Sequence, residues 1–555
     1  MKWKCGFLGM VFLFNLGYGM SREESEFQRF LQNRVGQIAP LLKEANLAYW
    51  NAAVTGNESD YARYGEYELK IRTLFSNSED FHRLKTWKAS RQIQDPLLSR
   101  QLDLLFLAYL PNQIPPDLLK SIVELSTQLE NRFSTFRGQI DGIFVTANQI
   151  DSILKTEKDP LRRKSAWLAS KQVGEAIASD LVRLVKLRNQ AAQRLGFKNY
   201  HALSLFASEQ NSEEIEALFN TLRNLTEAPF RKAKGELDSI LAQPFGISPK
   251  ELMPWHYHDP FFQEVPQVLE VNFDPYYAST DITTLAVQFF EGVGLPVNSI
   301  LDRSDLYEKP GKNPHAFCTH IDREGDVRIL CNLKNTERWM GTLLHELGHA
   351  VYEVHLDFTL PFLLREPAHA FVTEGIAMFF ERLSQDAEWM KDMLGLSPET
   401  YQTIEKPSAR YLRFQHLIFA RWAMVMFAFE KALYENPDQD LNALWWDLVE
   451  AYQGLQKPPD RNAPDWASKI HFVIAPCYYH NYLLGELFAS QLHHEIRMQV
   501  LGREGTSYVH CQKVGEFLKT RIFQHGTRYK WNSLIQIATE EPLNPTYFVE
   551  ECIEK

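Results

Sequence analysis

The sequence predicts a mainly α-helical protein built as two lobes with one small antiparallel hairpin. Apolar residues recur at three- and four-residue spacing from Ser21 to about Ala242, as expected of helices that each bury one stripe. Helical patterns resume at Thr336 and continue to the C-terminus, and strand-like alternation is found only near residues 316–332. With 45% hydrophobic and 23% charged residues in a chain of 555, a large buried core is expected.

Residues 1–19 form a segment distinct from the rest of the chain. Two lysines precede an apolar run at residues 7–14, and small residues follow at Gly17 and Gly19, the pattern of an export signal. We therefore expect a periplasmic or secreted protein. The alternative is a true start at Met20 and a cytoplasmic protein.

The first lobe, residues 20–245, is expected to be a helical lid or scaffold. Ser21 and Glu24 have the spacing of a capping box that opens its first helix. Helix boundaries are expected at Gly56-Asn57, at residues 112–116, at Asp159-Pro160 and at Gly196-Phe197. The long polar faces of this lobe carry no cluster of catalytic residue types.

The second lobe, residues 246–555, follows a proline-rich stretch at residues 243–266. Its predicted hairpin has arms at residues 316–322 and 326–332. Cys318 and Cys331 lie on opposite arms, where they either form a disulfide in an exported protein or remain two buried thiols.

Charge and hydropathy exclude several classes of partner. Lys and Arg number 59 against 70 Asp and Glu, so the net charge is −11, which disfavours binding to nucleic acid or to anionic membranes. No segment offers the 18 or more apolar residues of a membrane span, so no stable membrane association is expected. The oligomeric state is left open.

One pentapeptide carries most of the chemical information. His345-Glu-Leu-Gly-His349 places two imidazoles one helical turn apart on the same face, where both can bind one metal ion. Glu346 then projects beside the metal, positioned as the general base on metal-bound water.

A third ligand is expected from the next helix. Glu374 follows His349 by 25 residues, enough for the chain to leave one helix, cross a proline-containing loop and return antiparallel. Catalytic zinc takes three protein ligands and keeps one position open. We therefore predict one Zn²⁺ per chain on His345, His349 and Glu374.

These residues resemble those of the gluzincin peptidases, in particular the angiotensin-converting-enzyme (peptidyl-dipeptidase A) family and the related thimet oligopeptidase family. Three further segments carry the resemblance. They are residues 445–455 with Lys469-Ile-His471, the tyrosine-rich residues 478–483, and Gly311-Lys-Asn-Pro-His-Ala-Phe-Cys318. The motifs lie between about Met253 and His494, and the resemblance implies a two-lobed helical peptidase fold with a deep central cleft and its hairpin near the zinc site.

The resemblance also implies catalytic roles. Glu346 would move the proton from water to the leaving amine, and His471 and Tyr482 would donate hydrogen bonds to the oxyanion, with Tyr479 a rival for that role.

Substrate-binding roles follow in the same way. His315 and the backbone of Ala316 would hold an extended peptide at the hairpin edge. Lys469 and Tyr479 match residues that bind the substrate C-terminal carboxylate in converting enzymes. The glutamine that completes that anchor corresponds to Tyr257 if Trp255 is the correct point of alignment.

The chain departs from the converting enzymes at two further positions. Their chloride-binding arginine is Asn481 here, so chloride activation is not expected. Their aspartate supporting a zinc ligand is Met378 here, and Glu381 instead fits the oligopeptidase pattern.

The sequence thus predicts a zinc metallopeptidase that acts on short peptides and releases dipeptides from their C-termini. The first alternative is a broad oligo-endopeptidase of the thimet type. The second is a catalytically silent homologue that binds peptides or a partner, against which the intact Glu346 and metal ligands argue.

Overall fold

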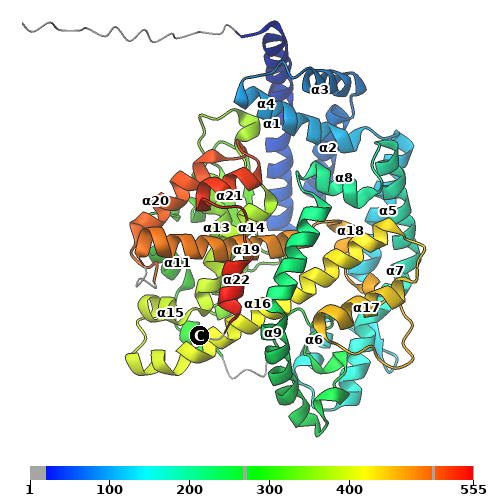
Figure 1. Cartoon of the computed structure of the whole chain (residues 1–555), viewed down its shortest axis with the longest axis vertical. Helices are drawn as coiled ribbons and strands as arrows, with labels where there is room; N and C mark the ends of the chain where they lie inside the picture. The colour runs from blue at the N-terminus through cyan, green and yellow to red at the C-terminus, as the bar shows by residue number, and fades with distance from the viewer. Residues whose placement is uncertain (1–19, 267–271, 503–506, 554–555) are drawn as a thin grey trace, which may run out of the picture.

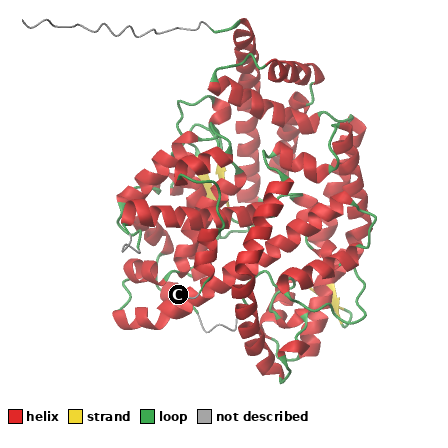
Figure 2. Cartoon of the chain, in the orientation of Figure 1, coloured by secondary structure: helices red, strands yellow, loops and turns green. Residues whose placement is uncertain are grey.

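The computed structural model of the chain describes residues 20–266, 272–502 and 507–553 (Figure 1). Helices dominate it, with two small pairs of strands (Figure 2). The predicted mainly α-helical fold is therefore confirmed. The predicted export signal at residues 1–19 lies outside the described residues.

The helices of the N-terminal half run through Ala242 with short interruptions. They are α1 (Arg22–Thr55), α2 (Glu58–Phe75), α3 (Ser78–Ser90), α4 (Pro96–Tyr109), α5 (Pro116–Thr135), α6 (Ala147–Thr156), α7 (Pro160–Arg194), α8 (Tyr200–Ala207) and α9 (Ser212–Ala242), with strands β1 (Gly138–Ile140) and β2 (Ile143–Val145) between α5 and α6.

The C-terminal half begins with short helices and a hairpin and ends in a helical bundle. Its elements are α10 (Asp274–Tyr277), α11 (Ile282–Gly292), α12 (Asn298–Leu301), β3 (Phe317–His320), β4 (Val327–Leu330), α13 (Glu337–Val354), α14 (Ala370–Glu381), α15 (Ala387–Leu394), α16 (Pro398–Glu435), α17 (Leu441–Gln453), α18 (His471–Ile474), α19 (His480–Ile496), α20 (Gln512–Arg521), α21 (Trp531–Thr539) and α22 (Thr546–Cys552).

The helix boundaries follow the local signals in the sequence. Ser21 and Glu24 form the expected capping box, with the Ser21 side chain accepting from the Glu24 N–H. Helix α1 ends at Gly56, whose φ of 72° is the left-handed conformation that glycine adopts without strain. A Cβ at Gly56 would lie 2.3 Å from the Gly311 carbonyl oxygen, so this position also requires glycine for close packing.

The predicted hairpin is confirmed, and a second one was missed. Strands β3 and β4 pair antiparallel with Phe317 opposite Leu330. The unpredicted pair β1–β2 turns through Asp141 and Gly142, both with positive φ (52° and 78°), as a two-residue hairpin turn requires.

The core crosses the predicted lobe boundary. One continuous cluster of buried hydrophobic residues extends from Leu125 to Cys552, so α5–α9 pack into the same core as the C-terminal half. A separate cluster joins α1, α3 and α4 with Leu363. The division at residues 245/246 stays a prediction. Among the described helices, none is both long and apolar enough to cross a bilayer.

Candidate active site

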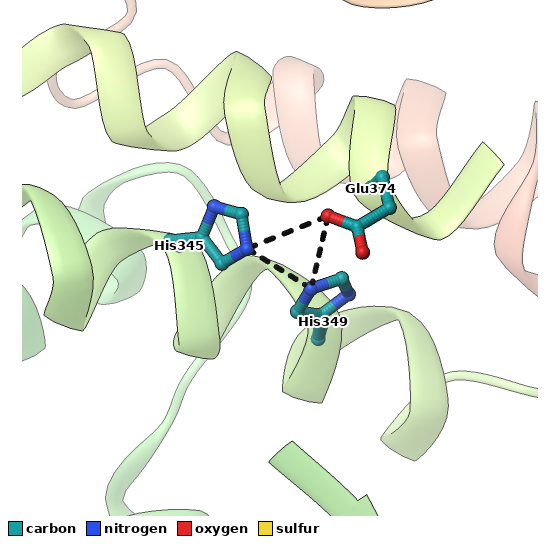
Figure 3. Close-up of side chains that lie close together, drawn as sticks. All are labelled: His345, His349 and Glu374. Carbon is teal, nitrogen blue, oxygen red and sulfur yellow. Dashed lines mark hydrogen bonds and ion pairs between the residues drawn. The ribbon is translucent and has the colours of Figure 1, made fainter. Parts of the chain in front are cut away.

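Two neighbouring helices bring the predicted metal ligands together (Figure 3). His345 and His349 lie on α13, with their Nε2 atoms 3.2 Å apart. Glu374 lies near the start of α14, and its Oε2 is 3.7 Å from His345 Nε2 and 3.9 Å from His349 Nε2. The structure thus brings all three side chains to one point.

Glycines allow this convergence. A Cβ at Gly348, inside the histidine pentapeptide, would lie only 2.8 Å from the Ala377 Cα of α14. A Cβ at Gly375 would lie 2.8 Å from Phe488 Cδ1 of α19. The absence of side chains at these positions lets α13, α14 and α19 pack close enough to present Glu374 to the histidines.

The donor set fits zinc. Nitrogen and oxygen ligands at 2.0–2.2 Å from a tetrahedral Zn²⁺ lie roughly 3.3–3.6 Å from one another, close to the observed separations. His345 Nδ1 is 2.7 Å from Glu381 Oε2, and His349 Nδ1 is 2.7 Å from Thr373 Oγ1. These partners occupy Nδ1 and leave both Nε2 lone pairs facing the shared point.

Carboxylates give the site a negative electrostatic potential. Burial on its own lowers the pKa of His345, but Glu381 and two further carboxylates raise it to about 10. A point of such negative potential favours a bound cation. Glu381 is the supporting carboxylate that the oligopeptidase-like pattern indicated.

The third ligand has a supporting contact that the sequence did not indicate. The Tyr478 hydroxyl donates to Glu374 Oε1 at 3.1 Å, which leaves Oε2 directed at the histidines. No motif distinguished Tyr478 from the tyrosines that follow it.

Glu346 is buried beside the predicted metal ligands. Its residue is 7% exposed, and burial raises its pKa to about 7, with Glu374 adding to the rise. The Cys318 N–H donates to it and opposes that shift. A carboxyl group that titrates near neutrality suits a general base.

A cavity of about 810 Å³ is bordered by His471, Tyr479 and Tyr482 together with Glu381. The ring centroids of His471 and Tyr479 are 4.9 Å apart, and those of Tyr479 and Tyr482 are 5.3 Å apart. Burial lowers the pKa of His471 to about 4, so its imidazole is neutral at pH 7. His471 Nδ1 is buried without a hydrogen-bond partner among the described residues, and it is therefore free to bind a ligand group.

Lys469 is surrounded by aromatic rings. Its Nζ lies 5.3 Å from the ring centroid of Phe261, 5.1 Å from Trp422 and 5.4 Å from Tyr479. Burial lowers its pKa to about 8. The Trp422 Nε1 donates to the Tyr479 hydroxyl at 2.7 Å, leaving that hydroxyl's proton free to bind a ligand.

The residue beside Lys469 is Gln263, not Tyr257. Gln263 Oε1 accepts from Lys469 Nζ at 2.7 Å, and Gln263 borders the cavity. The Tyr257 hydroxyl is instead engaged with Asp238 and Lys234, each at 2.8 Å. The correspondence of Tyr257 to the family glutamine stays a prediction, whereas the side chain in contact with Lys469 comes from further along an irregular loop.

His315 and Ala316 lie directly before β3. His315 is exposed, and Ala316 is half-buried. Within the described residues, β3 pairs only with β4, and the Cys318 N–H points to Glu346 on its other edge. Alternate residues of a strand share an edge, so the Ala316 backbone faces the same side.

Two other sequence expectations have structural counterparts. Cys318 and Cys331 are free thiols. Asn481 is buried, and its Oδ1 accepts from Gln210 Nε2 at 2.7 Å, so its closest polar contact is with another neutral amide.

Two histidines one turn apart on α13 and a glutamate from α14, with their ligand atoms converging, form the arrangement of a gluzincin-type metal centre. Comparison with known families agrees. Residues 21–256 match the family model described as angiotensin-converting enzyme, and residues 300–553 match peptidase family M3. The chain is therefore similar to two metallopeptidase families, each over a little under half of its length, and the resemblance begins well before Met253.

Individual relatives are distant. The chain is 25% identical to Carboxypeptidase 1 of Bacillus subtilis over 268 residues, which is 43% of this chain and 52% of that protein. It is 22% identical to Thermostable carboxypeptidase 1 of Pyrococcus furiosus over 421 residues, 70% of this chain and 77% of that protein. It is 21% identical to the Inactive angiotensin-converting enzyme-related protein of Caenorhabditis elegans over 362 residues, 58% of this chain and 40% of that protein. The chain thus matches about half the length of the first of these relatives.

Proposed function

We propose that the protein is a zinc-dependent peptidase that removes dipeptides from the C-termini of short peptides. The observation that carries the proposal is the convergence of His345, His349 and Glu374 beside a buried Glu346. His345 Nε2, His349 Nε2 and Glu374 Oε2 would hold the metal. The cavity of about 810 Å³ is large enough for a short peptide but not for a folded protein.

Each group in the site has a separate chemical role. Zinc, when bound, polarises the scissile carbonyl and acidifies the attacking water. Glu346 takes a proton from that water and passes it to the leaving nitrogen, for which its pKa of about 7 is well matched. Tyr482 and the neutral His471 donate hydrogen bonds to the developing oxyanion.

Dipeptide release is supported by the surroundings of Lys469. A substrate C-terminal carboxylate placed there would accept from Lys469 Nζ, the Tyr479 hydroxyl and the Gln263 amide. Charge-assisted hydrogen bonds of this kind are strong when water is excluded. The unpaired edge of β3 would bind the peptide backbone at Ala316, and His315 stands beside it.

Two other functions are weighed against this one. A broad oligo-endopeptidase is favoured by the match of residues 300–553 to peptidase family M3 and needs no C-terminal anchor. The relative named as inactive suggests the other alternative, a catalytically silent homologue. The retention of Glu346 and of three converging ligands here argues for an active enzyme.

The mode of cleavage is tested by product analysis. The zinc-loaded protein is incubated with one peptide carrying a free C-terminus and with the same peptide amidated, and products are identified by mass spectrometry. Dipeptides released only from the free form support the proposal. Equal cleavage of both forms would establish endopeptidase action, and single-residue release would establish a carboxypeptidase mode, as the names of two relatives imply for those proteins.

The general base is tested with Glu346→Gln. Loss of a general base typically costs about 10²–10⁴-fold in rate. We expect kcat to fall within that range while zinc content, measured by elemental mass spectrometry, stays at one per chain. A wild-type protein that binds zinc and peptide without turnover, unaltered by Glu346→Gln, would establish the silent homologue.

We further propose that residues 1–19 direct export and that short peptides, rather than nucleic acids or membranes, are the partners of the protein. Export is supported by the lysines and apolar run of that segment. N-terminal sequencing of the protein from its native host tests it. Cleavage close to Gly19 is expected, and an intact N-terminus on a cytoplasmic protein would contradict it.

A further inference from the structure

A second cavity, at the N-terminal helices, shares no lining residue with the cavity described above. Its volume is about 570 Å³, within the usual range for small-molecule sites. One wall comes from α3 and α4 and the opposite wall from residues 528–530, just before α21. In Figure 1, α3 and α4 lie at the top of the molecule and α21 below them.

Positive charge dominates this cavity in a chain whose net charge is −11. Five cationic side chains border it against one acidic one. The cationic residues are Lys88, Arg91, Arg100, Arg528 and Lys530, and the acidic residue is Asp103.

Some of these charges are neutralised within the protein. Lys88 is paired with Asp103. Arg100 is buried and makes a two-pronged contact with Glu209 at 2.5 and 2.6 Å. Lys530 Nζ is 3.8 Å from the same Glu209, so it shares a carboxylate that Arg100 already occupies.

Two of the five cationic side chains have no such pairing with Asp103 or Glu209. Arg91 and Arg528 are exposed, and neither lies within ion-pair distance of a carboxylate among the described residues; Asp357 is the acidic group whose charge interacts with Arg528 at longer range. Arg91 ends α3, and Arg528 lies over the Tyr529 ring at 5.5 Å. They come from the two opposite walls, so an anion between them would meet guanidinium groups from both sides.

The backbone adds to the positive potential. Helix α21 begins directly after Lys530, has no side-chain cap and carries no acidic residue in its first turn. Cations are unfavourable at a helix N-terminus, where the helix dipole is positive, and an anion there is favourable. Arg528 and Lys530 add to this positive potential, and Glu209 beside Lys530 and Asp357 near Arg528 oppose it.

We propose that this cavity binds a small phosphorylated metabolite, with its phosphate between Arg91 and Arg528 and near the start of α21. Guanidinium groups match the geometry of phosphate oxygens and hold them through paired hydrogen bonds. The volume is far larger than a halide needs, which favours a phosphate ester over a simple ion. The inference goes beyond the proposed peptidase function and does not depend on it.

Bound ligand would link the N-terminal helices to the main body. The two walls already meet where Arg100 Nε donates to the Thr527 carbonyl oxygen at 2.9 Å. A phosphate bridging Arg91 and Arg528 would add a second connection between α3–α4 and residues 526–530. We therefore expect ligand binding to slow hydrogen exchange in both segments together.

The test is calorimetric titration of the zinc-loaded full chain with inorganic phosphate and with fructose 1,6-bisphosphate. Sodium chloride at matched ionic strength is the reference. The variant is Arg91→Gln/Arg528→Gln. The control is Lys120→Gln/Arg183→Gln, which removes two exposed charges elsewhere. We expect saturable binding of the bisphosphate that weakens at least tenfold in the first variant and is unchanged in the control.

Several outcomes would overturn the proposal. They are heats that do not saturate, an effect reproduced by sodium chloride, and equal binding by the Arg91→Gln/Arg528→Gln variant. Since neither arginine makes an ion pair in the described structure, this variant is expected to fold, and its circular dichroism checks that. Hydrogen exchange gives an independent reading, because a bisphosphate bound elsewhere would leave residues 87–103 and 526–530 unprotected.

Discussion

Replacing Lys469 with methionine separates anchoring of a peptide C-terminus from the chemistry of the metal site. Methionine keeps much of the length and apolar contact of lysine but has no charge. The lost interaction is a charge-assisted hydrogen bond in a site enclosed by three aromatic rings. Such bonds contribute about 1.5–3 kcal/mol, so kcat/KM for a peptide with a free C-terminus should fall roughly 10- to 150-fold.

The same substitution should not destabilise the fold. Burial lowers the pKa of Lys469 from 10.5 to about 8, so keeping its ammonium charged in the folded state costs about 3 kcal/mol at pH 7. That cost is constant below pH 8 and vanishes as the pH rises toward 10.5, because only the unfolded chain then binds the proton. Lys469→Met removes the cost, and its Tm at pH 7 should equal or exceed that of the wild type.

The assay compares free and amidated forms of one peptide with wild type and Lys469→Met, and Lys457→Met serves as an exposed control. We expect a loss only for the free form, with activity on the amidated peptide and zinc content unchanged. Equal loss on both peptides would refute the anchoring role, since it would place Lys469 in folding or in the chemical step. No loss on either would mean that the C-terminus binds elsewhere.

Three further predictions follow from named contacts. The ammonium of Lys469 loses its proton above its pKa of about 8. We therefore expect kcat/KM for peptides with a free C-terminal carboxylate to fall as the pH rises through 8, while kcat/KM for amidated peptides stays constant. A parallel fall for both kinds of peptide would contradict this. Tyr478→Phe removes the hydrogen bond to Glu374 and should weaken zinc affinity by about tenfold in a competitive chelator titration. Unchanged affinity would show that Tyr478 does not orient Glu374. Gly348→Ala forces a methyl group against Ala377 and should lower stability by about 1–3 kcal/mol in urea denaturation, and a variant as stable as wild type would mean that α13 and α14 separate freely.

Local signals predicted most of the helical fold. The capping box at Ser21, the glycine at residue 56 and the proline at residue 160 all act within one helical turn, so the sequence carries the whole interaction. The β1–β2 hairpin was missed, although Asp141-Gly142 is a strong turn signal, because its strands have three residues each and the helical patterns on both sides dominate.

The metal site was predictable for a related reason. His345 and His349 are fixed by helical spacing, and Glu374 is brought in by an antiparallel return that a 25-residue gap allows. What the sequence did not contain was the reason that α13 and α14 approach so closely. That reason is the missing side chain at Gly348, which becomes visible only when Ala377 is seen beside it.

The contact between Gln263 and Lys469 was much harder to predict, because the placement of this glutamine depends on contacts far apart in the sequence. The Asp259 carboxylate accepts the N–H groups of Phe261 and Gln263 at 2.7 and 3.0 Å. Lys171 of α7 donates to the Pro260 carbonyl oxygen at 2.8 Å and lies over the Phe261 ring. Gln263 is thus presented to Lys469 by a buried amine and a buried carboxyl group, neither of which belongs to any motif. On the proposed function, the metal pentapeptide supplies hydrolysis and this loop selects the peptide end, so homologues can share the first while differing in the second.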